Sequence, residues 1–258
     1  MFDKNQLDWL LKALGGLEEP LGVCYTDQRP TEGYGPKTED AARHDCLMKF
    51  IRLARTRRSS GWISKNQPGC PGGGVYAGFL LPPPDSIAQH VTTGLPGREG
   101  EHYLPKPASM HRFFTALNLS PPPADYCVFK PLSLFSEDEE ILSVAFFVRG
   151  EVLTGLVQLA YFSLDDHEAV VFPFGSGCAS LLAWPFHYGK HGLDKAVVGG
   201  ADPSCRKYLG TDELSVAIPA STFKKMLAAA PESFLAGSTW KEVLKKIEKS
   251  RRVWSGGE

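Results

Sequence analysis

The chain has 258 residues, of which 43% are hydrophobic and 22% are charged, and its formal net charge at pH 7 is −1. This composition excludes a largely disordered chain, and the balanced charge argues against nucleic acid or an acidic membrane surface as a partner. The length suits one large domain over residues 1–258, although two small halves would also fit.

The N-terminal residues lack a basic segment followed by a long apolar run, so we expect no secretory signal. The longest apolar stretch, residues 141–148, is far shorter than a membrane-spanning helix requires. We therefore expect a soluble, cytoplasmic protein with no membrane partner. In that reducing compartment its six cysteines should be free thiols or ligands and not disulfides.

In the first half of the chain, hydrophobic periodicity indicates the helices and strands, and glycine and proline residues mark where they end. Two triple-proline runs, at 82–84 and 121–123, bracket a region of little apolar periodicity, so residues 82–123 are expected to form a surface excursion. The elements predicted for this half are helices over residues 7–14, from 38 or 40 to 57, and 109–117, and strands over 21–25 and 62–64.

The second half is more regular, with β-branched and aromatic runs between amphipathic segments. Such a mixture of strands and helices predicts an α+β fold with one or more mixed sheets. The predicted strands are residues 126–129, 141–148, 168–174, 195–198 and 214–218, and the predicted helices are 151–162, 178–186, 220–230 and 239–252.

Residues 20–80 and 141–187 present their elements in the same order. Each has a strand, a helix, a second strand and then a Gly-Cys pair, containing Cys70 or Cys178, before an apolar segment. Two interpretations remain open. The chain is an internal duplication with two pseudo-symmetric halves, or the agreement is a coincidence, because the β-α-β order is common.

Several short segments occur in a characteristic order: Pro20 to Tyr25, Cys46, Ala54-Arg55, Cys70-Pro-Gly-Gly-Gly, Gly78, Gly177-Cys178, Gly199-Gly200, Cys205-Arg206, and Asp212 to Pro219. In this order the chain resembles the family called domain of unknown function 169 over residues 7–230. The resemblance implies an origin among anaerobic bacteria and archaea, and it implies no particular reaction.

Four cysteines are candidate metal ligands: Cys46, Cys70, Cys178 and Cys205. Cys70 and Cys178 each follow a glycine and precede an apolar segment, and a helix N-terminus there would favour the thiolate that soft metals and iron–sulfur clusters require. The absence of any C-x-x-C spacing argues against such a site. The other two cysteines fall within predicted strands and are expected in the core: Cys24 and Cys127.

Two further patterns have a functional and a structural interpretation. The run Gly72, Gly73 and Gly74 could offer backbone N–H groups to an anionic cofactor, or form a flexible turn. The basic helix face could bind a phosphate or carboxylate, or be a solvated surface. Its members are Lys49, Arg52, Arg55, Arg57 and Arg58.

The sequence therefore favours a protein that binds a metal or an iron–sulfur cluster through cysteines. The alternative is a non-catalytic binding protein for a small anionic or apolar ligand. A cysteine-nucleophile enzyme is a weaker alternative, because no partner base is evident from the sequence.

Overall fold

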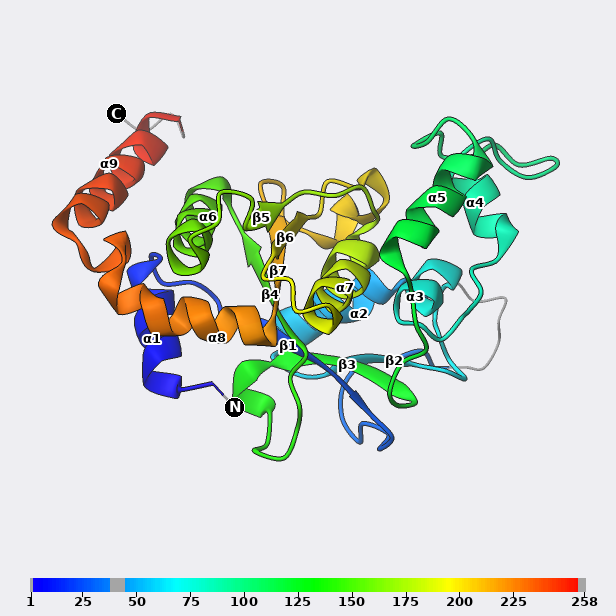
Figure 1. Cartoon of the computed structure of the whole chain (residues 1–258), viewed down its shortest axis with the longest axis horizontal. Coiled ribbons are helices and arrows are strands. Elements are labelled where there is room, and N and C mark those ends of the chain that lie inside the picture. Colours follow the sequence, from blue (N-terminus) through cyan, green and yellow to red (C-terminus); the bar gives the residue numbers. More distant parts are fainter. Residues whose placement is uncertain (1, 38–44, 255–258) are drawn as a thin grey trace.

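The computed structural model describes residues 2–37 and 45–254, which form one seven-stranded sheet covered by helices (Figure 1). The strand order is β2-β3-β1-β4-β7-β6-β5, and every neighbouring pair is antiparallel except β5 and β6. The α+β fold with a mixed sheet is thus confirmed. The strands are β1 Leu21–Thr26, β2 Gly61–Ser64, β3 Tyr126–Pro131, β4 Ser143–Val148, β5 Val170–Val171, β6 Ala196–Gly199 and β7 Leu214–Pro219.

The helices follow the predicted positions, and the helix expected after Cys70 is α3. One helix, α4, was not predicted, because it is short and its apolar positions give little periodicity. The α-helices are α1 Lys4–Ala13, α2 Leu47–Arg57, α3 Pro71–Tyr76, α4 Asp85–Val91, α5 Pro107–Leu117, α6 Gly150–Leu164, α7 Trp184–Lys190, α8 Ala220–Ala229 and α9 Ser238–Trp254.

Three departures from the predicted bounds are local. The predicted helix start at residue 38 or 40 lies outside the described residues, and the described helix α2 begins at Leu47. Strand β5 has only two residues. The predicted helix over 178–186 is a π-helical turn, η2 Ala179–Ala183, that continues into α7. No helix among the described residues is long and apolar enough to cross a membrane.

The alternation of side chains along each strand divides the core into two layers, one on each face of the sheet. Val23 lies in one layer and its neighbour Cys24 in the other. The first layer is packed by α2, α3, α5 and η2, and the second by α1, α6 and α8. Any site between α2, α3 and η2 therefore lies on the first face.

Two β-α-β crossovers run outward from the centre of the sheet, β1-α2-β2 toward one edge and β4-α6-β5 toward the other. Their helices lie on opposite faces of the sheet, α2 in the first core layer and α6 in the second. The two crossovers also differ in the number of strands that they pass over. Strand β3 alone separates β1 from β2, whereas β7 and β6 separate β4 from β5. The internal duplication stays a prediction.

Residues 82–123 form helices α4 and α5, which stand beside each other at one end of the molecule (Figure 1). Their inner faces join the first core layer through Ile87, Ala88, Met110, Phe113 and Leu117. The segment predicted as a surface excursion therefore also forms a wall of the protein interior.

The second core layer should depend strongly on Phe146 in β4, which is 1% exposed and meets the Phe223 ring edge-on with centroids 5.5 Å apart. We expect Phe146→Ala to lower the free energy of unfolding by about 3–5 kcal/mol, because the cavity left behind cannot fully collapse. Phe162→Ala, at a position 50% exposed, is the matched control and should change it by about 1 kcal/mol at most. Urea unfolding measures both, and equal losses would show that the layer is not packed as described.

Candidate functional site

The four candidate cysteine ligands line one cavity of about 770 Å³ on the first face of the sheet. They come from four separate segments: the start of α2, the start of α3, the turn before η2 and the 3₁₀ helix η3 Pro203–Tyr208. The fold thus brings together residues that are far apart in the sequence. A second hollow of about 510 Å³, near Phe2 and Lys224, is not lined by any of the described cysteines.

Cys46 and Cys70 interact with each other. Cys46 occupies the N-cap position of α2, and Cys70 caps α3, where its sulfur accepts the Gly73 N–H at 3.3 Å. The Cys70 thiol acts as hydrogen-bond donor to the Cys46 sulfur, and this is the largest cause that lowers the pKa of Cys46 to about 6. The N–H groups of Met48 and Lys49 and the Tyr208 hydroxyl lower that pKa further, against the effect of burial.

The same interaction has the opposite effect on the partner. Donation to Cys46, together with burial, raises the pKa of Cys70 well above its usual range. The pair therefore combines one thiolate and one thiol that share a proton. A thiolate held in this way is both a nucleophile and a soft-metal ligand.

Cys178 and Cys205 are buried thiols that line the same cavity. Burial raises the pKa of Cys178 well above its usual range and that of Cys205 to about 11. The expectation that a helix N-terminus lowers the pKa of Cys178 is wrong. Its side chain caps no N–H group and is 5% exposed, so the loss of solvation dominates.

Cys205 is fixed by the segment around it. Its thiol donates to the Asp202 carbonyl oxygen at 3.1 Å. The next residue, Arg206, donates to four backbone carbonyl oxygens, those of Gly200, Gly210, Thr211 and Glu213. These four hydrogen bonds, the carbonyl clamp of Arg206, hold η3 against the end of β6. They thereby also fix the position of Cys205, which belongs to η3.

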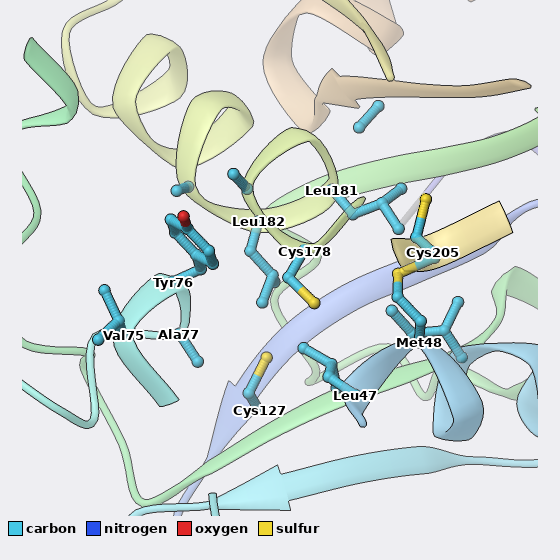
Figure 2. Packing of buried hydrophobic residues seen from close by; sticks show 14 of the residues in the cluster. Leu47, Met48, Val75, Tyr76, Ala77, Cys127, Cys178, Leu181, Leu182 and Cys205 are labelled. Atoms are coloured by element: carbon cyan, nitrogen blue, oxygen red, sulfur yellow. The ribbon is translucent and has the colours of Figure 1, made fainter. Parts of the chain in front are cut away.

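Two methionines, Met48 and Met110, line the cavity together with the four cysteines. A Cβ placed on Gly177 would lie 3.0 Å from Met48 Sδ and 3.1 Å from Cys205 Sγ, so both sulfurs border the space that this glycine leaves open. Figure 2 shows the Met48 and Cys205 side chains together, and the Cys178 sulfur turned toward Cys127 in β3. Met48 could not be identified from the sequence, because its place in the cavity depends on the tertiary fold.

The two cysteines predicted for the core are buried. Cys127 lies beneath the cavity, where burial raises its pKa well above its usual range. Cys24 belongs to the layer on the opposite face of the sheet. All six cysteines are free in the structure.

The glycine run begins α3 beside the pair of cysteines. Gly72 and Gly73 line the cavity, and Gly74 packs against Pro68. The Gly73 N–H is occupied by the Cys70 sulfur. A role of Gly72, Gly73 and Gly74 in binding an anionic cofactor stays a prediction.

The basic face of α2 has structural partners. Arg55 forms two hydrogen bonds with the Glu213 carboxylate, at 2.9 and 3.1 Å, and lies over the Phe147 ring. Arg58 pairs with Glu19, and Lys49 with Asp45. These contacts favour the structural interpretation of the face.

The outer part of the cavity is built largely by the segment over residues 82–123. Sequence reasoning missed these residues because the short helix α4 gives a weak periodic signal. The polar groups there include Glu101, which accepts from the Ser204 hydroxyl at 2.5 Å. The wall residues are Ile87, His90, Val91, Arg98, Glu101, Tyr103, Met110, Phe172 and Phe174.

Among residues 2–37 and 45–254, no three His, Cys, Asp or Glu side chains stand close enough together to hold a metal ion. The cysteines thus share a cavity without forming a closed metal site in this state.

Cys46 should react with iodoacetamide far below the pH at which an ordinary thiol reacts. Because its pKa lies at about 6 instead of 9.0, the rate should rise through about pH 6 and level off above it. The other thiols have raised pKa values or are buried and should react only in alkali or after unfolding. Rates followed by mass spectrometry test this, with Cys46→Ser losing the low-pH phase and Cys24→Ser keeping it. A first phase centred near pH 9 would contradict the shared proton.

The open space at Gly177 should be essential to the packing of the sulfurs. In Gly177→Ala the new Cβ would meet the Cys205 Cβ at 2.9 Å and Met48 Sδ at 3.0 Å. We expect a loss of about 1–3 kcal/mol in the free energy of unfolding from overpacking. Gly189→Ala is the control, since its Cβ would meet only Pro219 at 3.5 Å within helix α7. Equal stabilities of the two variants in urea would refute the assignment.

Comparison with known families agrees with the resemblance seen in the sequence. The family model for domain of unknown function 169, described as uncharacterised ArCR, matches residues 10–229, a range that contains all four cavity cysteines. No curated protein and no solved structure matches the chain significantly. Since the family model covers well over half of the sequence, the chain belongs to the family domain of unknown function 169.

Proposed function

We propose that the chain binds a metal ion or an iron–sulfur cluster through Cys46, Cys70, Cys178 and Cys205. The observation that carries the proposal is the convergence of these four cysteines on one cavity from four separate segments. Thiolates are the protein ligands of iron–sulfur clusters and of soft metal ions.

The protonation of the cysteines supports a site that closes on its metal. Cys46 already favours the thiolate, whereas Cys70, Cys178 and Cys205 have raised pKa values and must lose protons to become ligands. Metal binding supplies the free energy for this and releases the protons. The absence of a preformed set of three ligands among the described residues means that the sulfurs must approach one another on binding.

We also infer that the protein works in a reducing compartment, the cytoplasm. Six free cysteines, one of them with a lowered pKa, suit an environment in which thiols stay reduced.

Metal analysis of protein purified without oxygen tests the proposal. We expect bound metal in the wild type, brown in colour if it is an iron–sulfur cluster, and loss of most of it when any of the four cysteines is replaced by serine. Cys24→Ser is the matched control, because that buried thiol lies on the opposite face of the sheet. Metal-free wild-type protein, or four serine variants that all keep the wild-type metal content, would refute the proposal.

A second candidate is a binding protein for a small anionic or apolar organic ligand. The observation that favours it is the size of the cavity, about 770 Å³, which is in the range of organic-ligand pockets and well beyond the needs of a metal ion. Its wall is rich in apolar side chains, with Arg98 among the few cations. Colourless, metal-free protein that retains an organic molecule after purification would favour this function.

A further inference from the structure

Two histidines lie one helical turn apart at the C-terminal end of α7. His187 belongs to the helix, and His191 is its C-cap, with its backbone N–H bonded to the His187 carbonyl oxygen at 3.2 Å. Residues at positions i and i+4 share one face of a helix, and two histidines at this spacing are a common pair of metal ligands. Neither histidine lines the cavity of the four cysteines, so the pair is a separate feature of the molecule.

The hydrogen bonds of the two rings fix which nitrogen of each carries the proton. His187 Nδ1 lies 3.0 Å from the Leu117 carbonyl oxygen at the end of α5, and His191 Nδ1 lies 2.7 Å from the His187 carbonyl oxygen. A carbonyl oxygen only accepts hydrogen bonds, so each Nδ1 must donate. In a neutral imidazole the lone pair is then on Nε2. This is the tautomer of a metal-ligating histidine, whose other N–H donates to a carbonyl or carboxylate oxygen.

The spacing of the rings suits one shared ion. The ring centroids of His187 and His191 lie 4.5 Å apart, and the ring planes are inclined by 41° and not parallel. A metal ion about 2.1 Å from Nε2 lies about 3.2 Å from the ring centre, so two imidazoles that bind it at about a right angle have centres about 4.5 Å apart. The two rings therefore already have the separation of two ligands on one ion.

The surroundings of His187 hold the pair in place and leave it accessible. The His187 ring meets the rings of Trp184 and Tyr188 edge-on, with centroids 5.8 and 5.4 Å apart. Together with the bond to Leu117, these contacts restrict the ring before any ion arrives, which lowers the entropy cost of binding. His187 is half-buried and His191 is exposed, so an ion can reach the pair from solvent.

The donor set selects the class of ion. Imidazole nitrogen suits Cu²⁺, Ni²⁺ and Zn²⁺, whereas Mg²⁺ and Ca²⁺ prefer oxygen ligands. Among residues 2–37 and 45–254 no third His, Cys, Asp or Glu side chain joins the two histidines in a metal-binding group, so water must supply the remaining ligands. Cu²⁺ and Ni²⁺ accept such a mixed N,O set, whereas structural Zn²⁺ sites take four protein ligands.

We propose that His187 and His191 bind one borderline divalent cation, Cu²⁺ or Ni²⁺, through their Nε2 atoms. In the binding step two metal–nitrogen bonds form, two water molecules leave the hydrated ion, and no electron is transferred. No proton is released, because each neutral imidazole already has its lone pair on Nε2, whereas a thiol must lose a proton to bind. The site is independent of the proposed cysteine site.

Calorimetric titration of the reduced full-length protein with Ni²⁺ at about pH 8, where histidine is ordinarily neutral, tests the inference. We expect His187→Asn and His191→Asn each to lower the affinity of one binding step by at least about 10-fold, because either change removes the chelate. The Asn side-chain N–H can still donate to the carbonyl oxygen that Nδ1 meets, so these variants remove the ligand and keep the hydrogen bond. His167→Asn, at an exposed histidine elsewhere, is the control and should bind as the wild type does.

Titration in buffers of different protonation enthalpy separates this site from the cysteines. The step that depends on the histidines should release no protons, whereas a step at the thiols should release them. If folded wild-type protein binds no Ni²⁺, or if every binding step survives both Asn variants, the histidine site is wrong. Proton-releasing binding that survives both Asn variants and is lost in Cys46→Ser would leave the proposed cysteine site standing alone. Far-UV circular dichroism confirms that each variant is folded.

Discussion

The hydrogen bond from Cys70 to Cys46 is the interaction on which the proposed metal site depends most. The Cys70 donor is the largest cause that lowers the pKa of Cys46 against the effect of burial, which raises the pKa of the other buried thiols in the cavity. With it, and with the first turn of α2 behind the sulfur, the pKa of Cys46 falls to about 6. A buried thiolate is costly unless hydrogen-bond donors surround it. The fold must therefore hold the N-termini of α2 and α3 next to each other for this pair to form.

The architecture meets that requirement by tying α2 to several parts of the chain. Its apolar face packs on the sheet, and Arg55 joins it to Glu213 at the start of β7. The carbonyl clamp of Arg206 holds the neighbouring segment that carries Cys205. Helices α4 and α5 then close the outer wall, which makes a cavity out of what would otherwise be an open face of the sheet.

The sequence predicted much of the fold because its strands and helices have strong local patterns. Residues 141–148 read as a buried strand and form the central strand β4, and the four cysteines chosen as ligands do line one cavity. The pKa pattern could not be predicted, since that of Cys46 depends on Cys70 and Tyr208, which approach it only in the folded state. The contribution of α4 and of Met48 was missed for the same reason, because each acquires its place through tertiary packing.

Anomalous diffraction from crystals of protein purified and crystallised without oxygen would test the central claim most directly. We expect a metal peak bonded to the sulfurs of both Cys46 and Cys70, at the inner end of the cavity. A cavity that holds only solvent or an organic molecule, with no anomalous peak beyond those of the sulfur atoms, would contradict a metal function for this site.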